Sequence, residues 1–153
     1  MKNQAEKKDL TPISELGEFK LIEKLTETFE IVNDSPVKII DGAHNYEGVE
    51  MLLRNYENKY GHLNTDIFFG FKKGKDINNI LNLIIGKTNY NLHLIEDDTF
   101  FDQEITKEIG YLLDKYGKNY KIASLDQFKK NKNPSILLGS LYLIGEYKKR
   151  KIT

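Results

Sequence analysis

Apolar residues in this chain follow two alternating patterns. Short, nearly continuous runs such as Val37–Ile40 ("VKII") and 65–71 ("TDIFFGF") are typical of strands buried on both faces. Longer segments between them, such as Tyr46–Tyr60, place apolar residues three and four positions apart, the spacing of one helix face. The pattern therefore predicts an α/β chain in which strands and helices alternate.

Strands alternating with helices imply right-handed βαβ units, because parallel strands need a crossover connection. We predict strands at 28–33, 37–40, 65–71, 91–96, 120–123 and 135–139, and helices at about 46–60, 76–85, 102–115, 124–130 and after Ser140. The expected fold is a Rossmann-like, three-layer domain with about six mostly parallel strands and helices on both faces. A single domain should cover 13–153, although 13–25 fits a helical stripe only loosely, and the polar residues 1–12 should be frayed or disordered.

Composition narrows the class of protein. The 153 residues include no cysteine, which excludes disulfides and thiolate metal sites, and Lys plus Arg (23) equals Asp plus Glu (23). Balanced charge predicts no nucleic-acid binding, and the Lys- and Asn-rich stretch 128–135 should be solvated loop. No apolar run approaches a membrane span, so we expect a soluble, cytoplasmic protein without a membrane partner.

Ligands of such sheets bind beyond the carboxyl ends of the strands, which directs attention to the loop "DGAHN". There Asp41 could accept two hydroxyl hydrogen bonds, as from a ribose diol, and His44 could donate to a phosphate or carboxylate oxygen. Asn45 could cap the following helix or bind a ligand. The alternative is that Asp41 and Asn45 only satisfy turn and cap amides while His44 is exposed. Residue types alone leave both interpretations open.

Two other features indicate ordinary structure. The "GKT" at 86–88 matches the end of a phosphate-binding P-loop, but Leu81 replaces that loop's first glycine and the segment ends a helix, so Gly86 is interpreted as a helix cap. No G-x-x-x-x-G-K-[ST] motif occurs in the sequence. His62 and His93 have no companions at metal-ligand spacing, so no metal site is predicted.

Four segments together resemble a known family. They are "FEIVN" (29–33), "VKIIDGAHNYEG" (37–48), "DIFFGFKKGKD" (66–76) and "SILLGSLYLIGEYKK" (135–149). In order and spacing they are similar to the C-terminal domain of folylpolyglutamate synthases and dihydrofolate synthases, in the Mur ligase superfamily, with its "DGAHNP" and terminal "TGSLYLVGEVR" motifs. Two departures are Tyr46 in place of the proline after "DGAHN", and Glu27 and Thr28 in place of a "GR" before the first strand.

The resemblance implies an ATP-dependent ligase of folate biosynthesis and one-carbon metabolism. Such enzymes use ATP and Mg²⁺ to add L-glutamate to folate or dihydropteroate through an acyl phosphate. By resemblance, Asp41 and Asn45 would bind nucleotide, His44 would be catalytic and contact glutamate, and Ser140 would bind glutamate or cap the last helix. Lys75 and Asp76 match the family's Lys-Asp pair.

In this family the P-loop and the Mg²⁺ ligands belong to a separate central domain, so we expect the chain alone to be inactive and to need that domain in cis or in trans. An expressed fragment, a split-gene subunit and the remnant of a truncated gene all remain open. A second hypothesis is a stand-alone, non-catalytic binding or regulatory module that keeps the fold.

Overall fold

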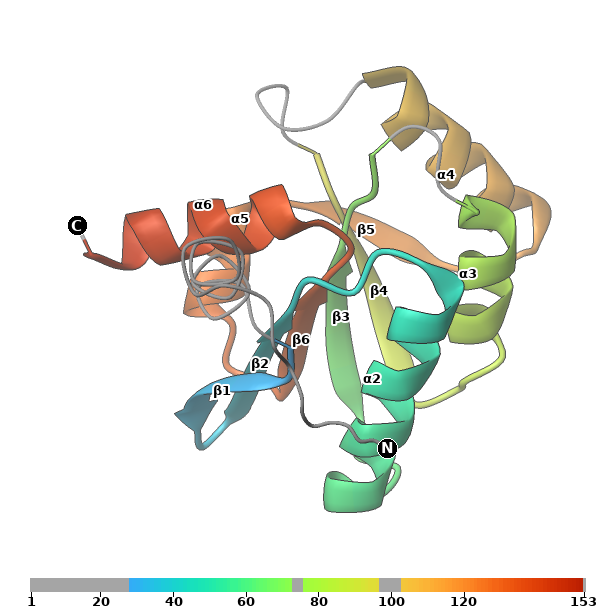
Figure 1. Ribbon diagram of the computed structural model, residues 1–153. Helices are drawn as coiled ribbons and strands as arrows, with labels where there is room; N and C mark the ends of the chain where they lie inside the picture. The colour runs from blue at the N-terminus through green and yellow to red at the C-terminus, as the bar shows by residue number, and fades with distance from the viewer. Residues whose placement is uncertain (1–27, 73–75, 97–102, 153) are drawn as a thin grey trace, which may run out of the picture.

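A computed structural model describes residues 28–72, 76–96 and 103–152 (Figure 1). Six strands form one sheet: β1 (Glu30–Asp34), β2 (Val37–Asp41), β3 (Thr65–Phe69), β4 (Tyr90–Ile95), β5 (Tyr120–Ala123) and β6 (Ser135–Leu138). The helices are α2 (Tyr46–Tyr60), α3 (Ile77–Ile85), α4 (Gln103–Lys115), α5 (Leu125–Lys130) and α6 (Leu141–Ile152). The predicted α/β fold with a mostly parallel six-stranded sheet is therefore confirmed, and the predicted boundaries of these elements agree to within two residues.

The strand order is β1-β2-β6-β3-β4-β5. Only β1 runs antiparallel to its neighbour, β2, and the other four pairings are parallel. The last strand, β6, therefore lies between β2 and β3. This order brings the carboxyl ends of β2, β6 and β3 together at one edge, although β2 and β6 are almost a hundred residues apart in the chain.

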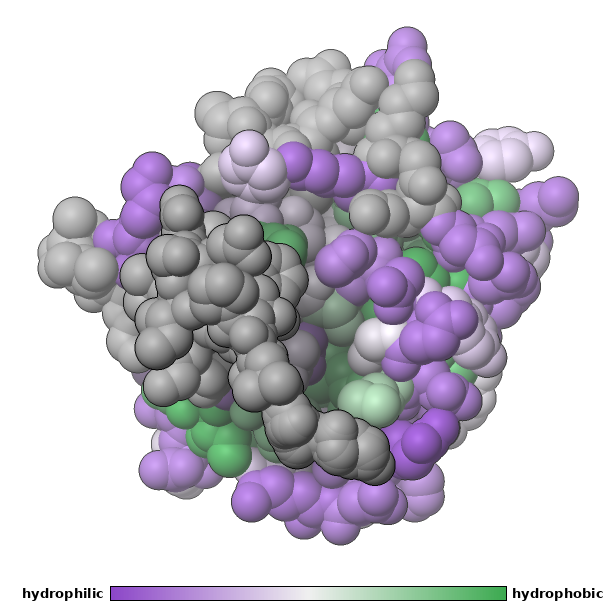
Figure 2. Space-filling view, viewed as in Figure 1, coloured by the Kyte–Doolittle hydropathy of each residue, from purple (hydrophilic) through white to green (hydrophobic). Residues whose placement is uncertain are grey.

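Helices cover both faces of the sheet. The larger apolar core lies under α2, α3 and α4, and the smaller core lies under α5 and α6, where Phe128 and Ile144 pack against residues such as Phe68. The surface over α2 to α4, at the right of Figure 2, is mostly hydrophilic, as expected for helices that bury one face. Within the described ranges no helix is long and apolar enough to cross a membrane. The predictions for residues 1–12 and 13–25 concern segments outside these ranges.

Candidate functional site

Three loops meet where β2, β6 and β3 end. Gly139, which follows β6, has φ of +115°, and a Cβ atom added there would lie 2.1 Å from the carbonyl oxygen of Gly70, which follows β3. Only glycine fits this close approach without strain. The loop after β6 therefore lies directly against the loop after β3, and the "DGAHN" turn follows β2 on the other side of β6.

Asp41 is buried at the end of β2, with 3% of its surface exposed. Its Oδ1 accepts a hydrogen bond from the Ala43 amide (2.8 Å) and its Oδ2 accepts one from the Phe29 amide (2.9 Å). Burial raises the pKa of Asp41, and the two backbone donors only partly oppose that rise. Asp41 thus holds the turn, while each carboxylate oxygen keeps a further lone pair for a ligand.

His44 and Asn45 follow in the same turn. His44 Nδ1 lies 2.9 Å from the carbonyl oxygen of Gly42, and because a carbonyl only accepts, Nδ1 must carry a proton. In the neutral imidazole, Nε2 is therefore an acceptor. Asn45 is exposed and is the N-cap of α2, its Oδ1 accepting from the Gly48 amide (2.8 Å). Asn45 therefore caps α2, as one of the two interpretations predicts. Its NH₂ group takes no part in that bond and can donate to a ligand.

Ser140, 4% exposed, stands immediately before α6. Its Oγ accepts a hydrogen bond from the Tyr142 amide (3.1 Å), the arrangement of a helix N-cap. The hydroxyl hydrogen is not used in that bond, so Ser140 can cap α6 and still donate to a ligand.

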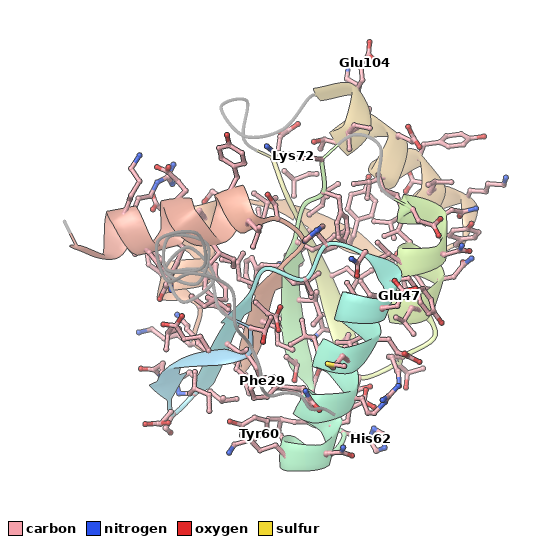
Figure 3. The ribbon with its side chains drawn as sticks, viewed as in Figure 1. Phe29, Glu47, Tyr60, His62, Lys72 and Glu104 are labelled. Atoms are coloured by element: carbon pink, nitrogen blue, oxygen red, sulfur yellow. The ribbon has the colours of Figure 1, made fainter. Side chains whose placement is uncertain are left out.

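A pocket of about 230 Å³ joins the "DGAHN" and "GSLY" motifs. It is lined by His44, Lys72, Gly139, Ser140, Leu141 and Tyr142. The structure therefore brings His44 and Ser140 together, whereas Asp41 and Asn45 flank the pocket without lining it. Figure 3 labels Lys72 in the loop that follows β3.

Sequence reasoning missed Lys72 and Tyr142. The Lys72 Nζ lies 3.4 Å from the centroid of the Tyr142 ring, a close cation–π contact. Lys72 belongs to the loop after β3, and Tyr142 lies in the first turn of α6, just after β6. Their positions after parallel strands were the available signal, but nothing in the sequence indicates that they meet. Lys75 lies outside the described residues, and Asp76 accepts a hydrogen bond from Asn79 Nδ2 (2.8 Å) at the start of α3.

A larger hollow, about 730 Å³, lies toward the amino ends of β3, β4 and β5. Its most buried charged group is Asp66, which accepts hydrogen bonds from the amide groups of Asn91 (3.0 Å), Asn131 (3.1 Å) and Asn133 (3.1 Å). The Nε2 of His93 lies 3.7 Å from the same carboxylate. Burial alone would raise the pKa of Asp66, but these partners hold it well below its usual range. The cluster satisfies its own carboxylate, so it calls for no ligand.

The P-loop-like segment has a structural role. Gly86 ends α3 with its amide donating to the Asn82 carbonyl (3.1 Å), which agrees with the predicted helix cap. Lys87 Nζ lies 3.1 Å from Glu57 Oε1 in an ion pair. Among the described residues, no group of three or more His, Cys, Asp or Glu side chains could hold a metal ion.

The fold is that of Mur ligases. A crystal structure of UDP-N-acetylmuramate-alanine ligase from Thermotoga maritima matches with a TM-score of 0.52 at 14% identity, covering 81% of this chain and 29% of the ligase. No family model matches the sequence. This comparison by itself gives the class of fold.

Within that class the similarity extends to sequence. Dihydrofolate synthase/folylpolyglutamate synthase of Bacillus subtilis is 26% identical over 127 residues, which cover 79% of this chain and 29% of the relative. Folylpolyglutamate synthase of Thermotoga maritima has a TM-score of 0.66 at 21% identity over 82% of this chain. The Yersinia pestis bifunctional synthase, solved with AMPPNP and a manganese ion, has a TM-score of 0.63 at 15% identity over the same share of the chain.

The chain is homologous to folylpolyglutamate and dihydrofolate synthases of the Mur ligase superfamily, and it spans about 30% of the length of these relatives.

Proposed function

We propose that this chain is the C-terminal domain of a folylpolyglutamate or dihydrofolate synthase, the domain that binds L-glutamate and one side of ATP. The observation that carries the proposal is the shared pocket: His44 and Ser140, from motifs almost a hundred residues apart, line one cavity at the carboxyl edge of the sheet. This edge is where α/β sheets bind ligands. The 26% identity to the Bacillus subtilis synthase supports the same assignment.

The proposed reaction has two steps. The folate or dihydropteroate carboxylate first attacks the γ-phosphorus of ATP and gives an acyl phosphate and ADP. The glutamate amine then attacks the acyl carbon, and the tetrahedral intermediate expels phosphate to leave an amide. In a complete enzyme, Asp41 accepts hydrogen bonds from the ribose hydroxyls through its remaining lone pairs, and Asn45 contacts the nucleotide through its NH₂ group.

His44 and Ser140 serve the glutamate. Since Nδ1 of His44 is held by the Gly42 carbonyl, a neutral His44 offers the Nε2 lone pair, which can take a proton from the attacking amine. Once protonated, the same nitrogen donates toward the developing oxyanion or the leaving phosphate. Ser140 directs its hydroxyl hydrogen to a carboxylate oxygen of glutamate.

Phosphoryl transfer needs more than these residues. The Mg²⁺ that the family uses would balance charge on the phosphates, but the described residues contain no suitable ligand group, and we assign no step through the metal to this chain. We propose that a P-loop domain, in cis or in trans, closes over the pocket to complete the site, in the cytoplasm where folates are elongated.

The test has two parts. The purified chain, given ATP, Mg²⁺, folate or dihydropteroate, and glutamate, should show no ligase turnover, and clear turnover would refute the need for a second domain. Calorimetric titration should detect binding of ATP and glutamate that Asp41→Ala weakens for ATP and Ser140→Ala weakens for glutamate. His62→Ala is the matched control, because His62 lies at the far end of α2 (Figure 3). Binding of neither ligand would contradict the proposal.

A further inference from the structure

We propose that Lys72, held in place by the ring of Tyr142, is the residue that selects an acidic amino acid over a neutral one in the His44–Ser140 pocket. This inference rests on the proposed function and adds a specificity determinant to it. Lys72 lies within the segment 66–76 that resembles the family, three residues before the Lys-Asp pair, but the resemblance assigns it no role.

The first argument for this role is the charge of the pocket. Among the residues that the structure describes, those that line it include one ammonium group and no carboxylate. The acid of the "DGAHN" turn, Asp41, is buried and is not among the residues that line the cavity. The cavity also lies at the start of α6, a twelve-residue helix whose positive dipole end adds to the field. A negatively charged ligand is therefore favoured here.

The second argument is the position of the Lys72 ammonium group. A lysine side chain at a loop surface normally samples many rotamers, and fixing them costs binding free energy. Here the Lys72 Nζ lies 3.4 Å from the centroid of the Tyr142 ring, and the backbone of Tyr142 belongs to the first turn of α6. Lys72 is thus oriented toward its anion before the ligand arrives.

The third argument is the size of the pocket. Its volume of about 230 Å³ is below the roughly 300 to 1,000 Å³ of sites for drug-sized ligands, so it suits a small anion more than a pteridine ring. Ser140 and Lys72 can each take one carboxylate, and His44 can face the amine. A dicarboxylic amino acid uses all three groups, whereas its side-chain amide would leave the lysine charge without a partner.

The experiment is an NMR-detected titration of the purified chain with L-glutamate, L-glutamine and inorganic phosphate. Lys72→Met should weaken glutamate binding about tenfold, as expected for loss of a charge-assisted hydrogen bond, and should bring glutamate and glutamine close to equal affinity. Tyr142→Phe, which keeps the ring, should bind as the parent does, and Tyr142→Leu should lose severalfold. The NMR spectra also report whether each variant is folded.

Lys59→Met is the matched control, because Lys59 also lies over a tyrosine ring, Tyr60, at 5.9 Å, but lines no part of the pocket. It should leave every affinity unchanged. Unchanged glutamate selectivity in Lys72→Met would overturn the inference while the proposed function stands. Binding of phosphate but not glutamate, lost in Lys72→Met, would support the anion site and overturn the glutamate assignment. Binding of none of the probes would overturn both.

Discussion

Asp41 and Asp66 are both almost fully buried, yet they lie at opposite edges of the sheet and have opposite electrostatic surroundings. Asp66, near the amino end of β3, has three asparagine amides and His93 around its carboxylate, and its pKa is lowered. Asp41, at the carboxyl end of β2, accepts hydrogen bonds from two backbone amides of the described residues, and its pKa is raised. The carboxylate of Asp66 is stabilised by side chains of the chain itself. The carboxylate of Asp41 is buried with fewer donors, at the edge where ligands bind.

This difference separates a structural aspartate from a candidate functional one better than burial does. A carboxylate with a full set of donors stabilises the folded chain and has little to gain from a ligand. A buried carboxylate with too few donors costs stability and gains from hydroxyl groups that reach it. The larger hollow is lined by Asp66, the aspartate with more donors. The smaller pocket is lined by His44, which follows Asp41, the aspartate with fewer donors, in the same turn.

The largest expected effect comes from adding a side chain at the close contact between the loop after β6 and the loop after β3. In Gly139→Ala the new Cβ would overlap the Gly70 carbonyl, and the positive φ would be strained, so we expect a loss of about 4 kcal/mol or more in the free energy of unfolding. Urea denaturation followed by circular dichroism measures it.

The control is Gly145→Ala, because a Cβ there meets no atom within 4 Å and Gly145 lies inside α6. Alanine is a better helix former than glycine, so this variant should be more stable than the parent by about 0.5 to 1 kcal/mol. Equal stability of the two variants would contradict the close approach of the loops after β6 and β3.

The next effect compares the two aspartates directly. Asp66→Asn should cost about 2 to 4 kcal/mol at pH 7, because one amide oxygen cannot replace a carboxylate that accepts from several donors. Asp41→Asn should cost less, about 1 kcal/mol, since the buried charge that burial penalises is removed as well. Asp114→Asn, on the exposed end of α4, should stay within about 0.5 kcal/mol of the parent. A larger loss for Asp41→Asn than for Asp66→Asn would reverse the comparison.

The smallest effect is in the pH dependence of these differences. The folded-state pKa of Asp66 lies below the unfolded value of about 3.9, so its stabilisation is present above that pH and is lost as the pH falls toward the folded pKa. The pKa of Asp41 is raised, so ionising it makes the folded state less stable as the pH rises through the raised value. The cost of Asp66→Asn should therefore shrink below about pH 4, and the cost of Asp41→Asn should be greatest there. Unfolding curves between pH 3 and 7 test for these opposite trends.

Local patterns were enough to predict the elements. Period and length separate a helix such as Tyr46–Tyr60 from a strand such as Val37–Asp41, and Ser124 caps α5 as its position before the helix indicates. Asp41 and His44 could be selected because they come at the end of a predicted strand, and Ser140 because its segment resembles the terminal motif of the family.

Pairings between distant segments could not be predicted. Stretch 128–135, beyond the predicted end of the helix 124–130, was expected to be solvated loop. Instead Phe128 is fully buried, and Asn131 and Asn133 reach Asp66, more than sixty residues away. The contact between Lys72 and Tyr142 is hidden for the same reason: it depends on β6 entering the sheet beside β3. The sequence pattern gives each partner but not the strand order that joins them.

The hydrogen bond from the Phe29 amide to Asp41 connects the entrance of β1 to the "DGAHN" turn. The Phe29 amide is one of the two donors that lower the pKa of Asp41. If the backbone at Phe29 moves away, the pKa of Asp41 rises further. The pKa of Asp41 therefore depends on the position of the backbone at Phe29, just before β1. A shift of that backbone would change the fraction of Asp41 that is ionised, and with it the charge of the "DGAHN" turn.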